Sequence, residues 1–173
     1  MTTRSDFSTD EWKLLTGVPW AVGLSVILSE DQGRRRATRQ ELAALAAAPA
    51  QAAAGFTSNT LVQAALPDIV ANAAAEQVKE HSSEKGAVEQ EIYEQTIKLC
   101  RRLTELLSAK APYGEADGYK RFVLAIGRAV ADAVADAEFL GIGGGKVSAH
   151  ERKLLRVIGD ALELDQEWEM EPL

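Results

Sequence analysis

The same helix–loop–helix pattern occurs twice in this chain, once near each end of its 173 residues. In each copy an apolar helix ends at an aspartate, a loop follows, and a Ser/Thr-x-x-Glu sequence opens a second apolar run. The first copy carries Asp31, Thr38 and Glu41, and the second carries Asp136, Ser148 and Glu151. A Ser/Thr-x-x-Glu sequence forms a capping box, in which both side chains accept hydrogen bonds from free N–H groups of the helix start. The pattern therefore predicts two helical hairpins.

The spacing of the two copies favours an internal duplication. Residues 38–45 lie 110 positions before residues 148–155, whereas Asp31 lies 105 positions before Asp136, so the second loop is five residues longer. Two equivalent hairpins can pack about a pseudo-twofold axis, with the intervening helices completing a bundle. The alternative is that capping boxes are common, and that two of them occur in one chain without any duplication.

The rest of the chain also has apolar residues at helical spacing, and no segment alternates apolar and polar residues as a half-buried strand does. A third capping box, Ser8 with Glu11, opens the first helix. We therefore expect an all-α fold, a single-domain helical bundle over residues 1–173. Its expected parts are hairpin one over about 9–47, central helices over about 58–110, hairpin two over about 116–164 and an acidic tail over 165–173.

Three prolines are expected to interrupt helices, because proline lacks the amide N–H and its ring clashes with the preceding turn. Pro19 should kink or split the first helix, and the helix that begins at Thr38 should stop near Pro49. Pro67 suits the first turn of a helix, so we expect one helix over 58–66 and another over 67–78. Two long helices are expected over 88–110 and 119–138.

Charge and cysteine content limit the classes of function. The net charge of −7 repels nucleic acid, and the only basic cluster is the arginines at 34–36 with Arg39. Four arginines on one loop are typical of a solvated turn or a partner contact, so we expect no nucleic-acid partner. The single Cys100 excludes an intramolecular disulfide and a cysteine-based zinc site.

No apolar signal region is present at the N-terminus, and no stretch approaches the roughly 18 apolar residues of a membrane span. We therefore expect no membrane span and a cytoplasmic protein. The sequence predicts neither an oligomeric state nor a particular protein partner.

Five acidic residues gather around the expected hairpin ends and are the candidate metal ligands. Closure of the hairpins should bring Asp31 near Glu41 and Asp136 near Glu151, and Asp132 lies one turn before Asp136 on the same helix face. Carboxylates that are held together repel one another, and hard divalent cations such as Ca²⁺, Mg²⁺ or Mn²⁺ relieve that repulsion. The alternative is that both glutamates only complete capping boxes and favour the helix N-termini electrostatically.

The two hairpins resemble those of the TerB-like proteins, a helical family associated with tellurite resistance and general stress. The matching pieces are Glu-Asp-Gln-Gly at 30–33 with the capping box at 38–41, and Ala-Asp at 135–136 with the box at 148–151. The chain departs from the family pattern where Gln32 separates Asp31 from its glycine, and where the second loop is enlarged. The resemblance implies a pseudo-symmetric helical fold and an acidic surface suited to metal binding.

The glycine-rich stretch 141–146 does not form a phosphate-binding loop, because Val147 stands where that motif needs Ser or Thr. No catalytic arrangement is present either, since His81 and His150 are the only histidines and neither belongs to a nucleophile motif. We therefore expect a non-enzymatic, stress-associated protein that binds a divalent cation or a partner through its acidic hairpin ends. The alternative is a metal-free adaptor or structural bundle that contacts proteins through the glycine-rich loop.

Overall fold

The computed structural model describes residues 1–29, 39–78, 87–139, 147 and 149–165, and in these residues the chain is helical without strands. This confirms the expected all-α bundle. The elements are the 3₁₀ helices η1 (Arg4–Asp6) and η2 (Ala54–Phe56) and the α-helices α1 (Thr9–Ser29), α2 (Arg39–Ala53), α3 (Thr60–Val78), α4 (Ala87–Lys110), α5 (Tyr113–Phe139) and α6 (Ala149–Ala161).

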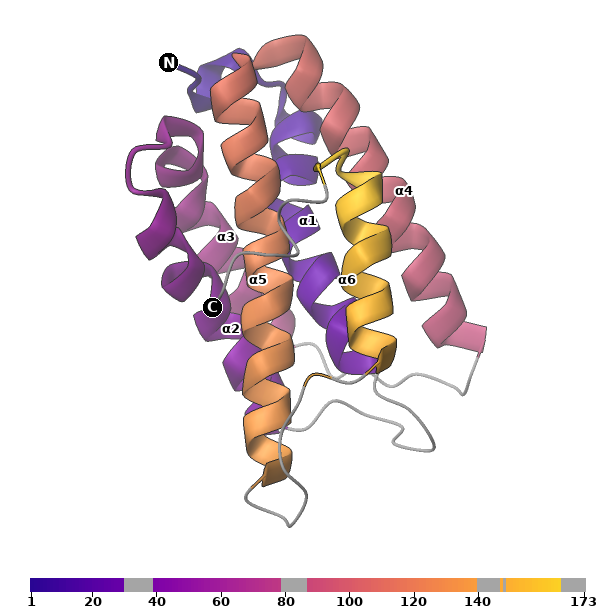
Figure 1. Cartoon of the computed structure of the whole chain (residues 1–173). Helices are drawn as coiled ribbons and strands as arrows, with labels where there is room; N and C mark the ends of the chain where they lie inside the picture. Colours follow the sequence, from indigo (N-terminus) through magenta and orange to yellow (C-terminus); the bar gives the residue numbers. More distant parts are fainter. Residues whose placement is uncertain (30–38, 79–86, 140–146, 148, 166–173) are drawn as a thin grey trace.

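Helix α1 runs through the middle of the bundle, and the other five helices all contact it. Successive helices run in opposite directions, so the connections lie at the two ends of the molecule (Figure 1). Helix α5 packs along α1, and α2 contacts both of these helices. The core is therefore built around the α1–α5 pair, which joins the first expected hairpin to the second.

The start of α1 confirms the capping box that the sequence predicts at this point. The Glu11 N–H donates to Ser8 Oγ at 3.3 Å, and the Ser8 N–H donates to Glu11 Oε2 at 2.7 Å. Phe7, directly before the cap, is buried and packs its ring on Trp12 at a centroid distance of 5.8 Å. These contacts satisfy two N–H groups of the first turn and fix the direction in which the chain enters the helix.

The prolines do not interrupt the helices as expected. Pro19, Pro49 and Pro67 each lie inside one continuous helix, and α2 continues past Pro49 to Ala53. In α1 the reason is visible. Pro19 cannot donate to the carbonyl of Leu15, four residues earlier, and the Tyr119 hydroxyl of α5 donates to that carbonyl at 2.9 Å. A side chain 100 residues away thus supplies the missing hydrogen bond.

Two further boundaries differ from the expected ones. Helix α5 begins at Tyr113, because the Pro112 carbonyl accepts hydrogen bonds from the Glu115 and Ala116 N–H groups directly after α4 has ended. Helix α6 ends at Ala161. There Glu163 takes a φ of 52°, and the Leu164 N–H donates to the Gly159 carbonyl at 3.0 Å. A left-handed residue followed by this longer hydrogen bond is a common way to close a helix.

Each hairpin has a close contact through a glycine of its first helix. Gly23 on α1 lies beside Leu45 and Val130, and Gly127 on α5 lies beside Leu155 and Val22. Each glycine therefore meets the leucine of its own hairpin's second helix and a valine of the other hairpin's first helix. Leu45 and Leu155 are the two leucines that the 110-residue spacing aligns. The glycines themselves are 104 residues apart, whereas the 105-residue spacing of the aspartates aligns Gly23 with Arg128, so the two contacts are similar and not strictly equivalent.

Helix α1 is long and apolar enough to cross a membrane by length and composition, with a mean hydropathy of 1.3 over 18 residues. The expectation that no stretch approaches this composition was therefore wrong. In the bundle, 61% of that window is buried among the other helices. Length and composition do not separate a core helix from a membrane span, and in this fold α1 is the core helix.

Gly127→Ala should destabilise the protein by about 1–3 kcal/mol, because a Cβ atom there would overpack the core. It would lie 2.9 Å from Leu155 Cδ2 and 3.0 Å from Val22 Cγ1, and both side chains are buried. Gly17→Ala is the matched control. A Cβ at Gly17 meets nothing within 4 Å, so this change should stabilise α1 by roughly 0.5–1 kcal/mol. Equal effects of the two substitutions on urea unfolding would contradict the packing described here.

Tyr119→Phe should lower the free energy of unfolding by about 1–3 kcal/mol, because it leaves the buried Leu15 carbonyl without a donor. In a Pro19→Ala background the new N–H at position 19 can bond that carbonyl, so the same Tyr119→Phe change should cost less. A double-mutant cycle by chemical denaturation measures the difference, and coupled residues typically show about 0.5–3 kcal/mol. A coupling energy of zero would show that Tyr119 does not compensate for Pro19.

Candidate functional site

The candidate site lies at one end of the bundle. Helices α1 and α5 end there, and α2 and α6 begin there, as Figure 1 shows. We call this the hairpin end, and Ser29, Arg39, Phe139 and Ala149 are the helix-terminal residues around it. Because α2 and α6 begin at the same end, Glu41 and Glu151 lie at one end of the bundle although they are 110 residues apart in the sequence.

The two capping-box glutamates occupy matching positions at the hairpin end. Glu41 is the third residue of α2 and Glu151 is the third residue of α6. Both are buried, with 8% of Glu41 and none of Glu151 exposed, and each takes part in at least one hydrogen-bond, ion-pair or electrostatic interaction. A buried carboxylate is costly unless it is paired, and the free N–H groups and positive dipole of a helix N-terminus favour it.

Of the three candidate aspartates, the structure describes the side chain of Asp132 alone. Asp132 lies on α5, is half-buried and also has an electrostatic or hydrogen-bonding partner. Asp136 belongs to the last two turns of α5, but its side chain lies outside the described part of the structure. Asp31 and both expected cap residues, Thr38 and Ser148, also lie outside the described residues. The grouping of the five candidate ligands therefore stays a prediction.

The described side chains alone do not form a metal site. Among them, no group of three or more His, Cys, Asp or Glu residues is placed to hold a metal ion. A cation at the hairpin end would therefore need the carboxylates of Asp31 and Asp136 in addition to Glu41, Glu151 and Asp132. Carboxylate oxygens are the donors that Ca²⁺, Mg²⁺ and Mn²⁺ prefer.

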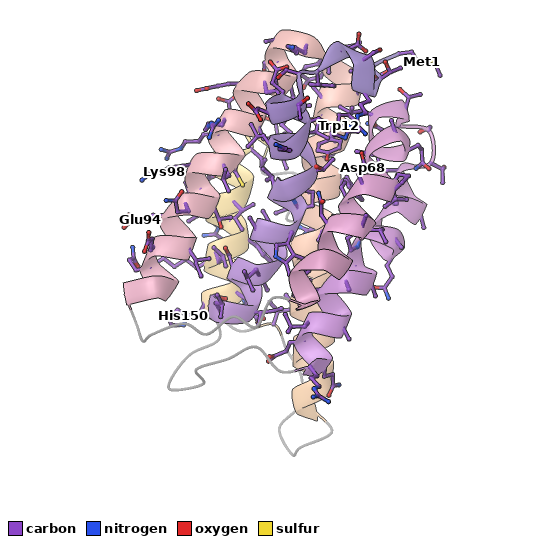
Figure 2. The ribbon with its side chains drawn as sticks, turned by 180° about the vertical axis from the view of Figure 1, so that it is seen from behind. Met1, Trp12, Asp68, Glu94, Lys98 and His150 are labelled. Carbon is purple, nitrogen blue, oxygen red and sulfur yellow. The ribbon has the colours of Figure 1, made fainter. Side chains whose placement is uncertain are left out.

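Burial keeps two titratable groups, the Cys100 thiol and the Tyr119 hydroxyl, in their protonated forms. Cys100 is fully buried, and burial raises the pKa of its thiol to about 12, which leaves almost no reactive thiolate near neutral pH. Burial likewise raises the pKa of Tyr119, so its hydroxyl stays protonated as the donor to Leu15. His150 is exposed at the start of α6 (Figure 2).

A second polar cluster, which sequence reasoning missed, lies at the opposite end of the bundle. Glu115 accepts hydrogen bonds from the Thr2 N–H at 2.8 Å and from the Thr60 hydroxyl at 2.9 Å. Asp68 accepts one from the Trp12 indole N–H at 2.7 Å. The partners are 113, 55 and 56 residues apart, so no local spacing pattern connects them.

Comparisons with known proteins add no family assignment. No protein-family model matches the chain, and no curated protein and no solved structure matches it. The resemblance to the TerB-like proteins therefore depends on the residues of the two hairpins alone.

Glu41→Ala and Glu151→Ala should each destabilise the metal-free protein by about 1–3 kcal/mol, because each side chain is buried and its polar or charged partners would lose the carboxylate. Glu105→Ala is the control, since Glu105 is exposed on α4. Urea unfolding in the presence of a chelator measures all three. A loss no larger than that of the control would contradict a capping role for these glutamates.

Proposed function

We propose that this chain is a non-enzymatic, TerB-like helical protein that binds a divalent cation at its hairpin end as part of a stress response. The observation that carries the proposal is the pair of buried glutamates, Glu41 and Glu151, at equivalent positions of two helices that begin at the same end. Capping a helix N-terminus does not require a buried carboxylate, so capping alone does not account for the burial of both glutamates.

The chemistry of the acidic residues selects the class of cation. Asp31, Asp132 and Asp136 add three carboxylates to the two glutamates, and cysteine and imidazole ligands do not belong to this set. All-oxygen donors suit Ca²⁺, Mg²⁺ and Mn²⁺ better than the softer metals that thiolates select. A bound cation would also offset the mutual repulsion of these carboxylates in a chain whose net charge is −7.

The internal duplication supports two related half-sites in place of one. A glycine–leucine contact joins the two helices of each hairpin, and under the internal duplication Asp31 with Glu41 and Asp136 with Glu151 would form matching acidic pairs. Asp132 has no counterpart among the candidate ligands of the first hairpin. We therefore expect the second pair, which has this extra carboxylate nearby, to bind the cation more tightly.

The melting temperature of chelator-treated protein tests the proposal when Ca²⁺, Mg²⁺, Mn²⁺ and Zn²⁺ are titrated separately. A cation at 100 times its dissociation constant should stabilise the native state by roughly 2.7 kcal/mol. Asp136→Asn should abolish most of this rise and Asp31→Asn a smaller part of it. Asp10→Asn is the matched control, because Asp10 lies in the first turn of α1 and its side chain is 95% exposed.

A saturable rise with one of the oxygen-preferring cations, reduced in the Asp31 and Asp136 variants but not in the control, is the expected result. A flat response to all four cations would contradict the proposal. Glu41 and Glu151 would then be helix caps only, and the adaptor function through the glycine-rich loop would take its place.

A further inference from the structure

The first eight residues form a strap across the end of the bundle opposite the hairpin end. Residues Arg4–Asp6 make the short helix η1, in which Asp6 Oδ2 accepts hydrogen bonds from the Thr3 N–H at 2.8 Å and the Thr3 hydroxyl at 3.0 Å. These local bonds tie residues 3–6 into one turn. Met1, Trp12 and Asp68 are labelled at this end in Figure 2. The strap therefore has an internal structure of its own and can move as one piece.

One carboxylate of α5 holds the beginning of the strap. The Thr2 N–H donates to Glu115 Oε2 at 2.8 Å, and the Met1 ammonium lies 3.5 Å from Glu115 Oε1. The Thr60 hydroxyl of α3 donates to the same Oε1 at 2.9 Å. The pKa of Glu115 is held below its usual value, although partial burial alone would raise it. The largest cause is the hydrogen bond from the Thr2 side chain; the Thr2 backbone, the Thr60 hydroxyl and the Met1 ammonium contribute less.

A second carboxylate, on α3, holds the middle of the strap. Asp68 Oδ2 accepts hydrogen bonds from Arg4 at 3.2 Å and from the Trp12 indole N–H at 2.7 Å. The Arg4 guanidinium also lies over the Trp12 ring, 5.7 Å from its centroid. The Arg4 and Asp68 side chains are 68% and 42% exposed, and ion pairs this open to water add little stability and are screened by salt.

The last part of the strap is held from the end of α4. Lys110 Nζ donates to the Asp6 carbonyl at 3.1 Å and to Glu11 Oε2 at 2.6 Å, and it lies 5.8 Å from the Phe7 ring centroid. The hydrogen bond from Lys110, and then that from the Ser8 N–H, holds the pKa of Glu11 below its usual value. Phe7 itself is buried against Trp12.

The strap thus has one large apolar anchor and three polar attachments. Phe7 is the only large apolar side chain of residues 1–8 that is buried, since Met1 is 91% exposed. Each helix of the bundle, in contrast, contributes several fully buried side chains to the common core where its residues are described. Terminal segments with few buried contacts open at lower free energy than the core.

We infer that the strap undocks as a unit from a folded bundle and that its release uncovers the Trp12 ring on which Phe7 packs. The strap is then a cover whose position depends on the ionic conditions. Phe7 leaves its contact with Trp12 in the same step in which Arg4 leaves Asp68 and Thr2 leaves Glu115. The Trp12–Asp68 hydrogen bond joins two helices of the bundle and does not need the strap.

The direction of the pH dependence follows from the carboxylates that face the strap. Glu11 and Glu115 have lowered pKa values. The pKa of Asp6 is also lowered, but its largest cause is the hydrogen bond from the Thr3 backbone within the strap, so Asp6 stabilises the turn and not its docking. Asp68 is the third carboxylate of the bundle that faces the strap. The stabilising effect of Glu11 and Glu115 is complete above the pKa of an unfolded carboxylate, about 4, and is lost as the pH falls through the lowered folded-state pKa values. Acid and high salt should therefore favour the open strap, and neutral pH at low salt should favour the closed one.

Trp12 can report the opening if it is the only tryptophan, so the test uses the full chain carrying Trp20→Phe and Trp168→Phe. Trp12 fluorescence, far-UV circular dichroism and the rate of tryptic cleavage after Arg4 are measured from neutral pH downwards. On acidification the Trp12 emission should shift to longer wavelength before the helical signal falls. Phe7→Ala should produce the shifted emission already at neutral pH with unchanged helicity, and should raise the rate of cleavage after Arg4 roughly tenfold or more.

Two variants separate undocking from general destabilisation. Glu115→Gln should move the emission transition to higher pH, whereas Asp10→Asn, which alters an exposed carboxylate of the same end, should leave it unchanged. If Trp12 emission and helicity change together in every variant, or if Phe7→Ala removes the helical signal, then the strap is part of the cooperative core and the inference is wrong.

Discussion

The hydrogen bond from the Tyr119 hydroxyl to the Leu15 carbonyl, 2.9 Å long and fully buried, replaces the donor that Pro19 cannot supply within α1. A break at Pro19 would divide the central helix that the other five helices contact. The bond also fixes α5 against α1, and the same pair of helices approaches closely through Gly23 and Gly127. Because α1 and α5 are the first helices of the two hairpins, this contact joins one hairpin to the other.

Local features of the fold could be predicted from the sequence, and long-range compensation could not. The Ser8–Glu11 box follows from the helix-start rule, because its partners are three residues apart. The continuity of α1 does not follow from any local rule, because the donor that replaces the Pro19 N–H lies in another helix. The low helix propensity of proline predicted a break at Pro19, whereas α1 is continuous and the Tyr119 hydroxyl supplies the missing donor. The glycine contacts were also hidden, although the 110-residue spacing had aligned the two leucines that make them.

At the candidate site, too, local features could be predicted from the sequence and long-range contacts could not. The helix-start pattern predicted Glu41 and Glu151 in the first turn of a helix, and each is the third residue of its helix in the structure. The capping boxes themselves stay a prediction, because Thr38 and Ser148 lie outside the described residues. The burial of Glu41 and Glu151 could not be predicted, since it depends on how α2 and α6 lie against the other helices. The cluster around Glu115 and Asp68 was missed for a stronger reason. Its partners come from different helices, and each residue alone has the appearance of an ordinary surface residue.

We propose different roles for the two ends of the bundle, with divalent-cation binding at the hairpin end and the strap at the opposite end. The most direct test of the first role is the amide NMR spectrum of ¹⁵N-labelled protein during addition of substoichiometric Mn²⁺, which broadens signals near the bound ion. The account predicts selective broadening in the first turns of both α2 and α6, reversed by excess Mg²⁺ or Ca²⁺. Uniform broadening, or broadening confined to residues remote from the hairpin end, would contradict it.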